Sequence, residues 1–133
     1  MSKEEEQALK ESYHSEAMRY MANATESLKK AGKKDKHYID DKYVKTACGI
    51  AYLGVLKALD GYLLLKGVAN PKKRKSIEHY NVNISKLDRK LMQDVDDVYK
   101  IIHLSGYYDG LTKVPIIKDG FDTAYQIIKR IEP

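Results

Sequence analysis

Apolar residues recur at steps of three and four along most of the chain, which predicts four long helical stretches. The first covers residues 2–31, where Ser2 and Glu5 form a capping box at its start. The second covers residues 40–66 and is closed by Gly67, a residue type that commonly ends helices. No stretch alternates between apolar and polar residues with a period of two, so we predict no sheet.

The third stretch begins near Ser76 and keeps its helical spacing for about thirty residues, which is long for a helix in a small domain. We therefore expect a break between Asp88 and Asp94, although the pattern leaves open whether 76–108 is one helix or two. The last stretch begins near Thr112. The predicted fold is all-α: a four-helix up-and-down bundle, with room for an additional short helix, in a single domain over 1–133.

The second stretch carries two different stripes of residues. One stripe is apolar and large, so most of the helix circumference avoids water, as in a helix that is central to the fold or shared with a second subunit. We therefore expect a homodimer, the commonest oligomer. The other stripe predicts a close contact with a neighbouring helix, because its members are small: Ala47, Ala51, Gly54, Ala58 and Gly61.

The composition is that of a soluble globular protein, with 133 residues, 43% of them hydrophobic and 32% charged. The acidic start of the chain is unlike a signal peptide. The apolar run 50–65 is interrupted by Lys57 and Asp60 and is too short to cross a bilayer, so we expect no membrane association. A lone Cys48 favours a reducing compartment, and we expect a cytoplasmic protein.

The net charge of +5 comes from lysine-rich segments between the predicted helices. Two interpretations remain open. These cations are solvated connector charges near helix C-termini, or they form a footprint for nucleic acid. The candidate basic patch comprises Lys33, Lys34, Lys72, Lys73, Arg74 and Lys75.

The segment 99–110 concentrates polar and aromatic residues where one helical pattern ends and the next begins. His103 follows Tyr99 by four positions and precedes Tyr107 by four, so the three side chains share one helical face. We expect a partly buried histidine that hydrogen-bonds a tyrosine hydroxyl or a carbonyl. The candidate groove or turn residues are Tyr99, His103, Tyr107, Tyr108 and Asp109.

No cofactor or metal site is expected from the sequence. None of the four histidines has another His, Cys or carboxylate at zinc-ligand spacing on one face. Glycine-rich phosphate loops and nucleophile elbows are also missing from the sequence. We identify no catalytic residues.

Four segments together resemble a small uncharacterised helical family from Bacteroidetes bacteria: 20–24, 47–63, 99–110 and 117–131. That family is similar to the HEPN superfamily of helical bundles, which includes toxin ribonucleases and substrate-binding subunits of nucleotidyltransferases. The resemblance implies a bundle that dimerises, and a partner such as a minimal nucleotidyltransferase.

Active HEPN ribonucleases carry an Arg-x4–6-His motif at the start of a late helix, and this sequence departs from it. Arg74 and His79 have the spacing but lie too early, and His103 lacks an arginine at the required offset. We therefore expect a non-enzymatic binding or accessory module that self-associates, with a nucleotide, an RNA or a protein as its ligand. The alternative is a degenerate or unconventional HEPN-type ribonuclease centred on His103.

Overall fold

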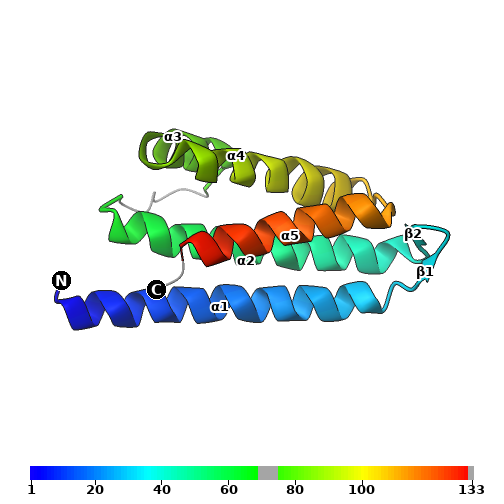
Figure 1. Cartoon of the computed structure of the whole chain (residues 1–133), viewed down its shortest axis with the longest axis horizontal. Coiled ribbons are helices and arrows are strands. Elements are labelled where there is room, and N and C mark those ends of the chain that lie inside the picture. Colours follow the sequence, from blue (N-terminus) through cyan, green and yellow to red (C-terminus); the bar gives the residue numbers. More distant parts are fainter. Residues whose placement is uncertain (69–74, 132–133) are drawn as a thin grey trace.

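The protein is all-α, as predicted, in a computed structural model that describes residues 1–68 and 75–131 (Figure 1). Two long helices run side by side, and the remaining helices pack over the second of them. The helical elements are α1 (Lys3–Lys29), α2 (Asp41–Leu65), α3 (Ile77–Leu87), α4 (Arg89–Val98), the π-helix η1 (Tyr99–Tyr108) and α5 (Val114–Arg130).

Between α1 and α2 the chain forms a small antiparallel hairpin, so the prediction of no sheet was wrong. Its strands, β1 (Lys33–Lys34) and β2 (His37–Tyr38), have two residues each. Asp35 and Lys36 reverse the chain with φ angles of 51° and 66°. Strands this short cannot show a period-two pattern, which is why the sequence gave no sign of them. The Tyr38 amide donates to the Thr112 carbonyl at 2.8 Å and joins the hairpin to the segment before α5.

The small-residue stripe of α2 contacts α1 closely, as predicted. A Cβ atom added to Gly54 would lie 2.9 Å from the Cβ of Tyr20, and one added to Gly61 would lie 2.6 Å from the Cβ of Tyr13. Any larger side chain at either glycine would push the two helices apart. These glycines therefore set the distance between α1 and α2.

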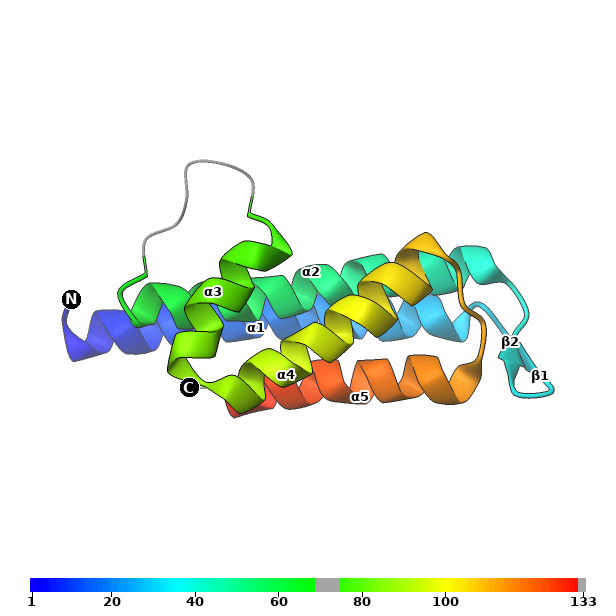
Figure 2. The same ribbon diagram turned by 90° about the horizontal axis from the view of Figure 1, so that it is seen from above.

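The predicted break in the third stretch falls at Asp88, where the backbone is extended with φ −159° and ψ 103°. Its carboxylate accepts the Leu91 amide at 3.0 Å and pairs with Arg130 of α5 at 2.8 Å. Residues 76–108 thus form α3 and then a second segment, α4 continued by η1, that crosses over α2 (Figure 2). A ten-residue π-helix was not foreseen, and π-helices occur mostly as single turns.

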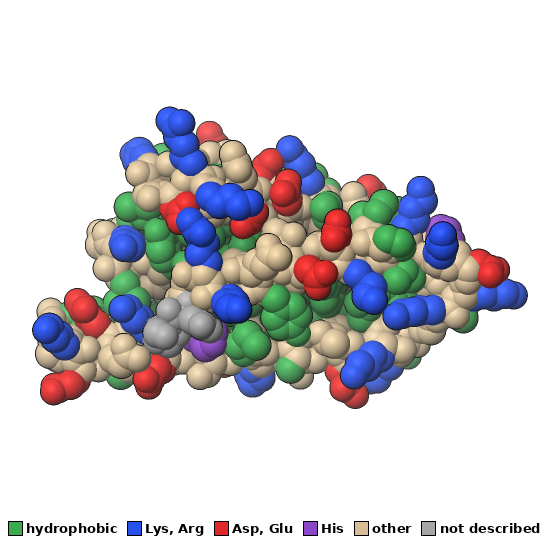
Figure 3. Space-filling model, viewed as in Figure 1, with side chains coloured by type: hydrophobic (Ala, Val, Ile, Leu, Met, Phe, Trp, Pro, Cys, Tyr) green, Lys and Arg blue, Asp and Glu red, His purple; other side chains and the backbone are tan. Residues whose placement is uncertain are grey.

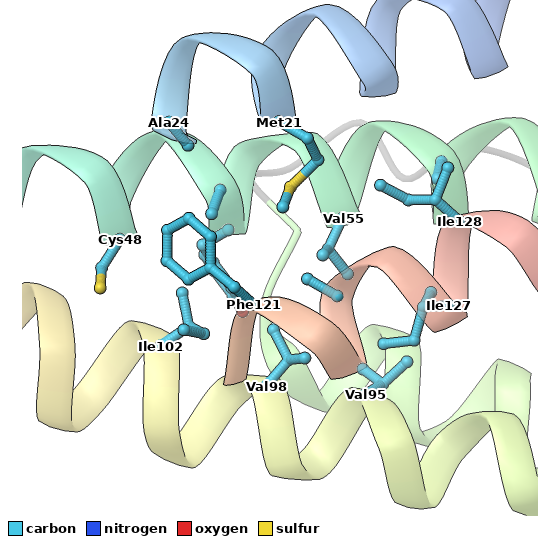
Figure 4. Close-up of a cluster of buried hydrophobic side chains, with 14 of the residues drawn as sticks. Met21, Ala24, Cys48, Val55, Val95, Val98, Ile102, Phe121, Ile127 and Ile128 are labelled. Carbon is cyan, nitrogen blue, oxygen red and sulfur yellow. The ribbon is translucent and has the colours of Figure 1, made fainter. Parts of the chain in front are cut away.

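The core lies where α2 meets α1, α4, η1 and α5. Met21, Val55, Val98, Ile102 and Phe121 come from these five elements and point toward one another (Figure 4). Cys48 is fully buried beside them and packs as a small apolar residue. α2 therefore serves as the central helix of the bundle.

By length and composition α2 is also long and apolar enough to cross a membrane, alone among the described helices. The sequence-based estimate of its apolar stretch was too short, because the helix begins at Asp41 and contributes apolar residues well before Ile50. Half of its most apolar 18-residue window is buried in the bundle, as expected for a core helix. Among the other residues of α2, Ile50 and Leu56 pack partly against the core, and Leu53 is exposed.

Candidate binding groove

A groove with a cavity volume of about 810 Å³ runs along α2. Its floor is the α2 face that carries Ile50, Leu53 and Leu56. One wall is formed by η1 and the start of α3, and Tyr20 of α1 lies on the groove's lining as well. The groove therefore contains apolar surface of α2 that the bundle covers only in part, since Ile50 and Leu56 are partly buried and Leu53 is exposed.

The η1 wall consists of stacked aromatic rings. His103 lies over Tyr52 of α2 with ring centroids 4.2 Å apart and planes inclined by 20°. Tyr99 and Tyr107 flank the imidazole at 5.4 Å and 5.8 Å, and Tyr108 approaches it edge-on at 5.1 Å. Four of the five predicted groove residues thus come together, as His103 and the three tyrosines around its imidazole.

The expected hydrogen bond of His103 to a tyrosine hydroxyl or a carbonyl was wrong. Within the described part of the chain its ring nitrogens form no hydrogen bond, and the contacts of the ring are aromatic instead. The side chain is half-buried, and this burial lowers the pKa of His103 below its ordinary value of 6.5. A neutral imidazole stacks as a flat, largely apolar ring.

Asp109 is the one predicted groove residue that does not line the groove. It ends η1, where its amide donates to the Leu104 carbonyl at 3.1 Å. The next residue, Gly110, has a φ of 67°, a left-handed conformation that glycine adopts readily at a turn. Asp109 therefore belongs to the turn that leads into α5.

Two residues that sequence reasoning missed hold α3 against α2 at the charged end of the groove. The Tyr80 hydroxyl donates to Asp60 Oδ1 at 2.8 Å. Asp60 Oδ2 pairs with the Lys75 ammonium at 2.9 Å. Burial, and then the hydrogen bond to the Asp60 carboxylate, raise the pKa of Tyr80. Tyr52 was also missed as a site residue, since its spacing marked it only as part of an apolar stripe.

The described members of the predicted basic patch do not come together. Lys33 and Lys34 lie in the hairpin at one end of the bundle (Figure 1), whereas Lys75 precedes α3, away from the hairpin. The charge of Lys75 is paired with Asp60. Lys72, Lys73 and Arg74 lie outside the described residues. The structure thus separates Lys33 and Lys34 from Lys75.

Metal binding finds no support among the described residues, which hold no group of three or more His, Cys, Asp or Glu side chains able to share an ion. The groove instead offers flat rings, aliphatic side chains and one neutralised ion pair. Such a surface binds by apolar burial and stacking.

Comparison with known proteins places the chain in a family. A family model described as a domain of unknown function, DUF5618, matches residues 12–133, so the chain belongs to this family. A solved protein of unknown function from Dyadobacter fermentans is 36% identical, with a TM-score of 0.81 over 92% of this chain and 94% of that one. No curated protein matches the chain. The Bacteroidetes resemblance is thereby supported, whereas neither description mentions HEPN.

Proposed function

We propose that this DUF5618 protein is a non-enzymatic helical binding module that self-associates, and that the groove along α2 receives a second copy of the chain. The observation that carries this proposal is the apolar strip of α2 that the bundle covers only in part, formed by Ile50, Leu53 and Leu56. The most apolar 18-residue window of α2 has a mean hydropathy of 1.5, yet only half of that window is buried in one chain. Leu53, at the middle of the groove floor, is 52% exposed.

The floor of the groove is suited to pairing with itself. From Thr46 to Leu56 the sequence of α2 contains no charged residue. If two α2 helices cross antiparallel at Leu53, each Ile50 faces the Leu56 of the second copy. An isologous contact of this kind closes with two chains and uses the same patch twice.

Charge favours a second copy over nucleic acid as the occupant. Nucleic acid is held mainly by cations that meet its phosphates. The groove presents Lys57 and Lys75 only at one end, and Asp60 already neutralises Lys75. A partner protein, such as the minimal nucleotidyltransferase that the HEPN resemblance implies, is the competing occupant. The proposal also assigns the protein to the cytoplasm and away from membranes.

The experiment is a mass measurement in solution by light scattering, at high micromolar concentration. We expect a dimer for the unmodified chain and a monomer for Leu53→Glu, because a carboxylate would be buried without a partner. The matched control is Val82→Glu, whose side chain is 49% exposed on α3 outside the groove and should leave the dimer intact. A monomeric unmodified chain, or a dimeric Leu53→Glu variant, would overturn the proposal.

The ribonuclease alternative makes a different prediction. In that case the purified protein cleaves single-stranded RNA, and His103→Ala abolishes cleavage without changing the fold. The aromatic surroundings of His103 favour a binding role, because a general base requires a nucleophile or substrate proton within hydrogen-bonding reach. Cleavage that depends on His103 would replace the non-enzymatic proposal.

A further inference from the structure

A second hollow, with a cavity volume of about 300 Å³, lies between α1, the hairpin and α5. It shares no lining residue with the groove along α2. We propose that this hollow binds a small aromatic carboxylate. The proposal is independent of the dimer, so either can fail without the other.

The inner surface of the hollow is apolar and largely aromatic. Tyr38 and Phe121 line it with side chains that are almost fully buried, and Leu28 adds an aliphatic wall. The hydroxyls of Thr25 and Tyr125 lie 3.2 Å apart and satisfy each other. A flat apolar body therefore finds rings to pack against without leaving these hydroxyls unpaired.

The rim of the hollow is basic. Three lysines line it against one carboxylate, that of Asp122, which gives a formal excess of two positive charges: Lys29, Lys33 and Lys118. None of the three ammonium groups forms an ion pair with another described residue. Figure 3 shows basic side chains around exposed hydrophobic surface between α1 and α5, toward the hairpin end.

The combination selects the chemical class of the ligand. Unpaired ammonium groups at the rim favour an anion, since charge-assisted hydrogen bonds to a carboxylate are stronger than neutral ones. The aromatic interior favours a ring, and the volume lies at the lower end for small-molecule sites. A phenyl ring with a short chain and one carboxylate meets all three requirements.

The hairpin fixes the geometry of the rim. Lys33 precedes the turn, and its ammonium lies 6.0 Å from the ring centroid of Tyr38 in the paired strand. The Val114 amide donates to the Lys36 carbonyl at 2.9 Å, so the hairpin is held to the first residue of α5. Lys33 and Lys118 are thereby carried on two elements that hydrogen bonds join.

The test is calorimetric titration of the full chain with 3-phenylpropionate and with 3-phenylpropionamide, which has nearly the same shape without the charge. We expect saturable one-to-one binding of the carboxylate and about tenfold weaker binding of the amide. Absence of saturable carboxylate binding at millimolar concentration, or equal binding of the two compounds, would overturn the proposal.

Variants locate the site. Lys118→Gln and Lys33→Gln should each weaken carboxylate binding about three- to tenfold and leave amide binding unchanged. Both side chains are exposed, so the fold should tolerate these changes. Lys86→Gln, on an exposed lysine of α3 outside both cavities, is the matched control and should bind like the unmodified chain. An equal loss in Lys86→Gln would show that the carboxylate responds only to net charge, which contradicts the proposal.

Discussion

The imidazole of His103 lies on the ring of Tyr52, with centroids 4.2 Å apart and planes inclined by 20°. This contact joins η1 to α2 across 51 residues of sequence. It also builds the wall of the groove, because Tyr99 and Tyr107 lie on either side of His103 in the same row. The groove is therefore shaped by aromatic packing, and its stability and its pH response should both depend on His103.

Replacement of His103 should show that stacking is its main contribution. His103→Ala removes the ring and should lower the free energy of unfolding by about 1–2 kcal/mol, from the lost aromatic pair and the lost apolar burial. His103→Phe keeps a flat ring and should retain most of that stability. Urea unfolding curves of the unmodified chain, His103→Ala and His103→Phe give the three free energies of unfolding to be compared. Equal destabilisation by Ala and Phe would mean that an imidazole nitrogen is required.

The pH dependence of stability should also trace to His103. Because burial lowers its pKa in the folded protein, the unfolded chain binds a proton more readily in the range below about 6.5. The free energy of unfolding should then fall as the pH drops through that range, until the folded protein is protonated too. The difference between the unmodified chain and His103→Phe isolates this effect, since the other three histidines are present in both. If the difference in free energy of unfolding between the two proteins stays constant across this pH range, His103 is not the source of the pH dependence.

The helices were predictable because their signals are local. Ser2 accepts the Glu5 amide at 3.0 Å as the capping box requires, and Asp88 breaks the third stretch within the expected interval. Gly67 ends the second stretch as expected, in a left-handed conformation with a φ of 82°. Each of these features depends on residues within a few positions of one another, which is the range over which sequence patterns carry information.

The site was only partly predictable because it depends on packing between distant segments. The row of Tyr99, His103 and Tyr107 follows from spacing, but its contact with Tyr52 requires the orientation of η1 over α2. A π-helix and an α-helix place residues four apart on nearly one face, so the sequence did not distinguish them. The bond between Asp60 and Tyr80 likewise depends on how α3 crosses α2.

Two glycines of α2 should respond oppositely to the same substitution. Gly54→Ala should destabilise the protein by about 1–3 kcal/mol, because the new methyl would meet the Cβ of Tyr20 at 2.9 Å and the Ala17 carbonyl at 3.2 Å. Gly49→Ala meets only the ring of Tyr107, which is partly exposed and can turn away. It should be neutral or stabilising by up to about 1 kcal/mol through helix propensity. Thermal unfolding gives the melting temperature of each variant. Similar shifts in melting temperature for both variants would show that the α1–α2 contact is not tight.

The hydrogen bond between Tyr80 and Asp60 should control the docking of α3. Few residues of α3 meet α2, so the 2.8 Å bond and the neighbouring Lys75 ion pair are its main polar links to α2. Tyr80→Phe keeps the buried ring but leaves Asp60 with one partner fewer, which should cost about 1–2 kcal/mol. Hydrogen exchange followed by mass spectrometry should show faster exchange over Ile77–Leu87 and unchanged exchange in α1 and α2, because local opening exposes the weakest-held element first.

Ser85→Ala, which removes an exposed hydroxyl of α3 bonded to Asn81, is the matched control and should leave exchange of α3 unchanged. Uniformly faster exchange across all helices in Tyr80→Phe would show that α3 does not open separately and would contradict this role for the bond.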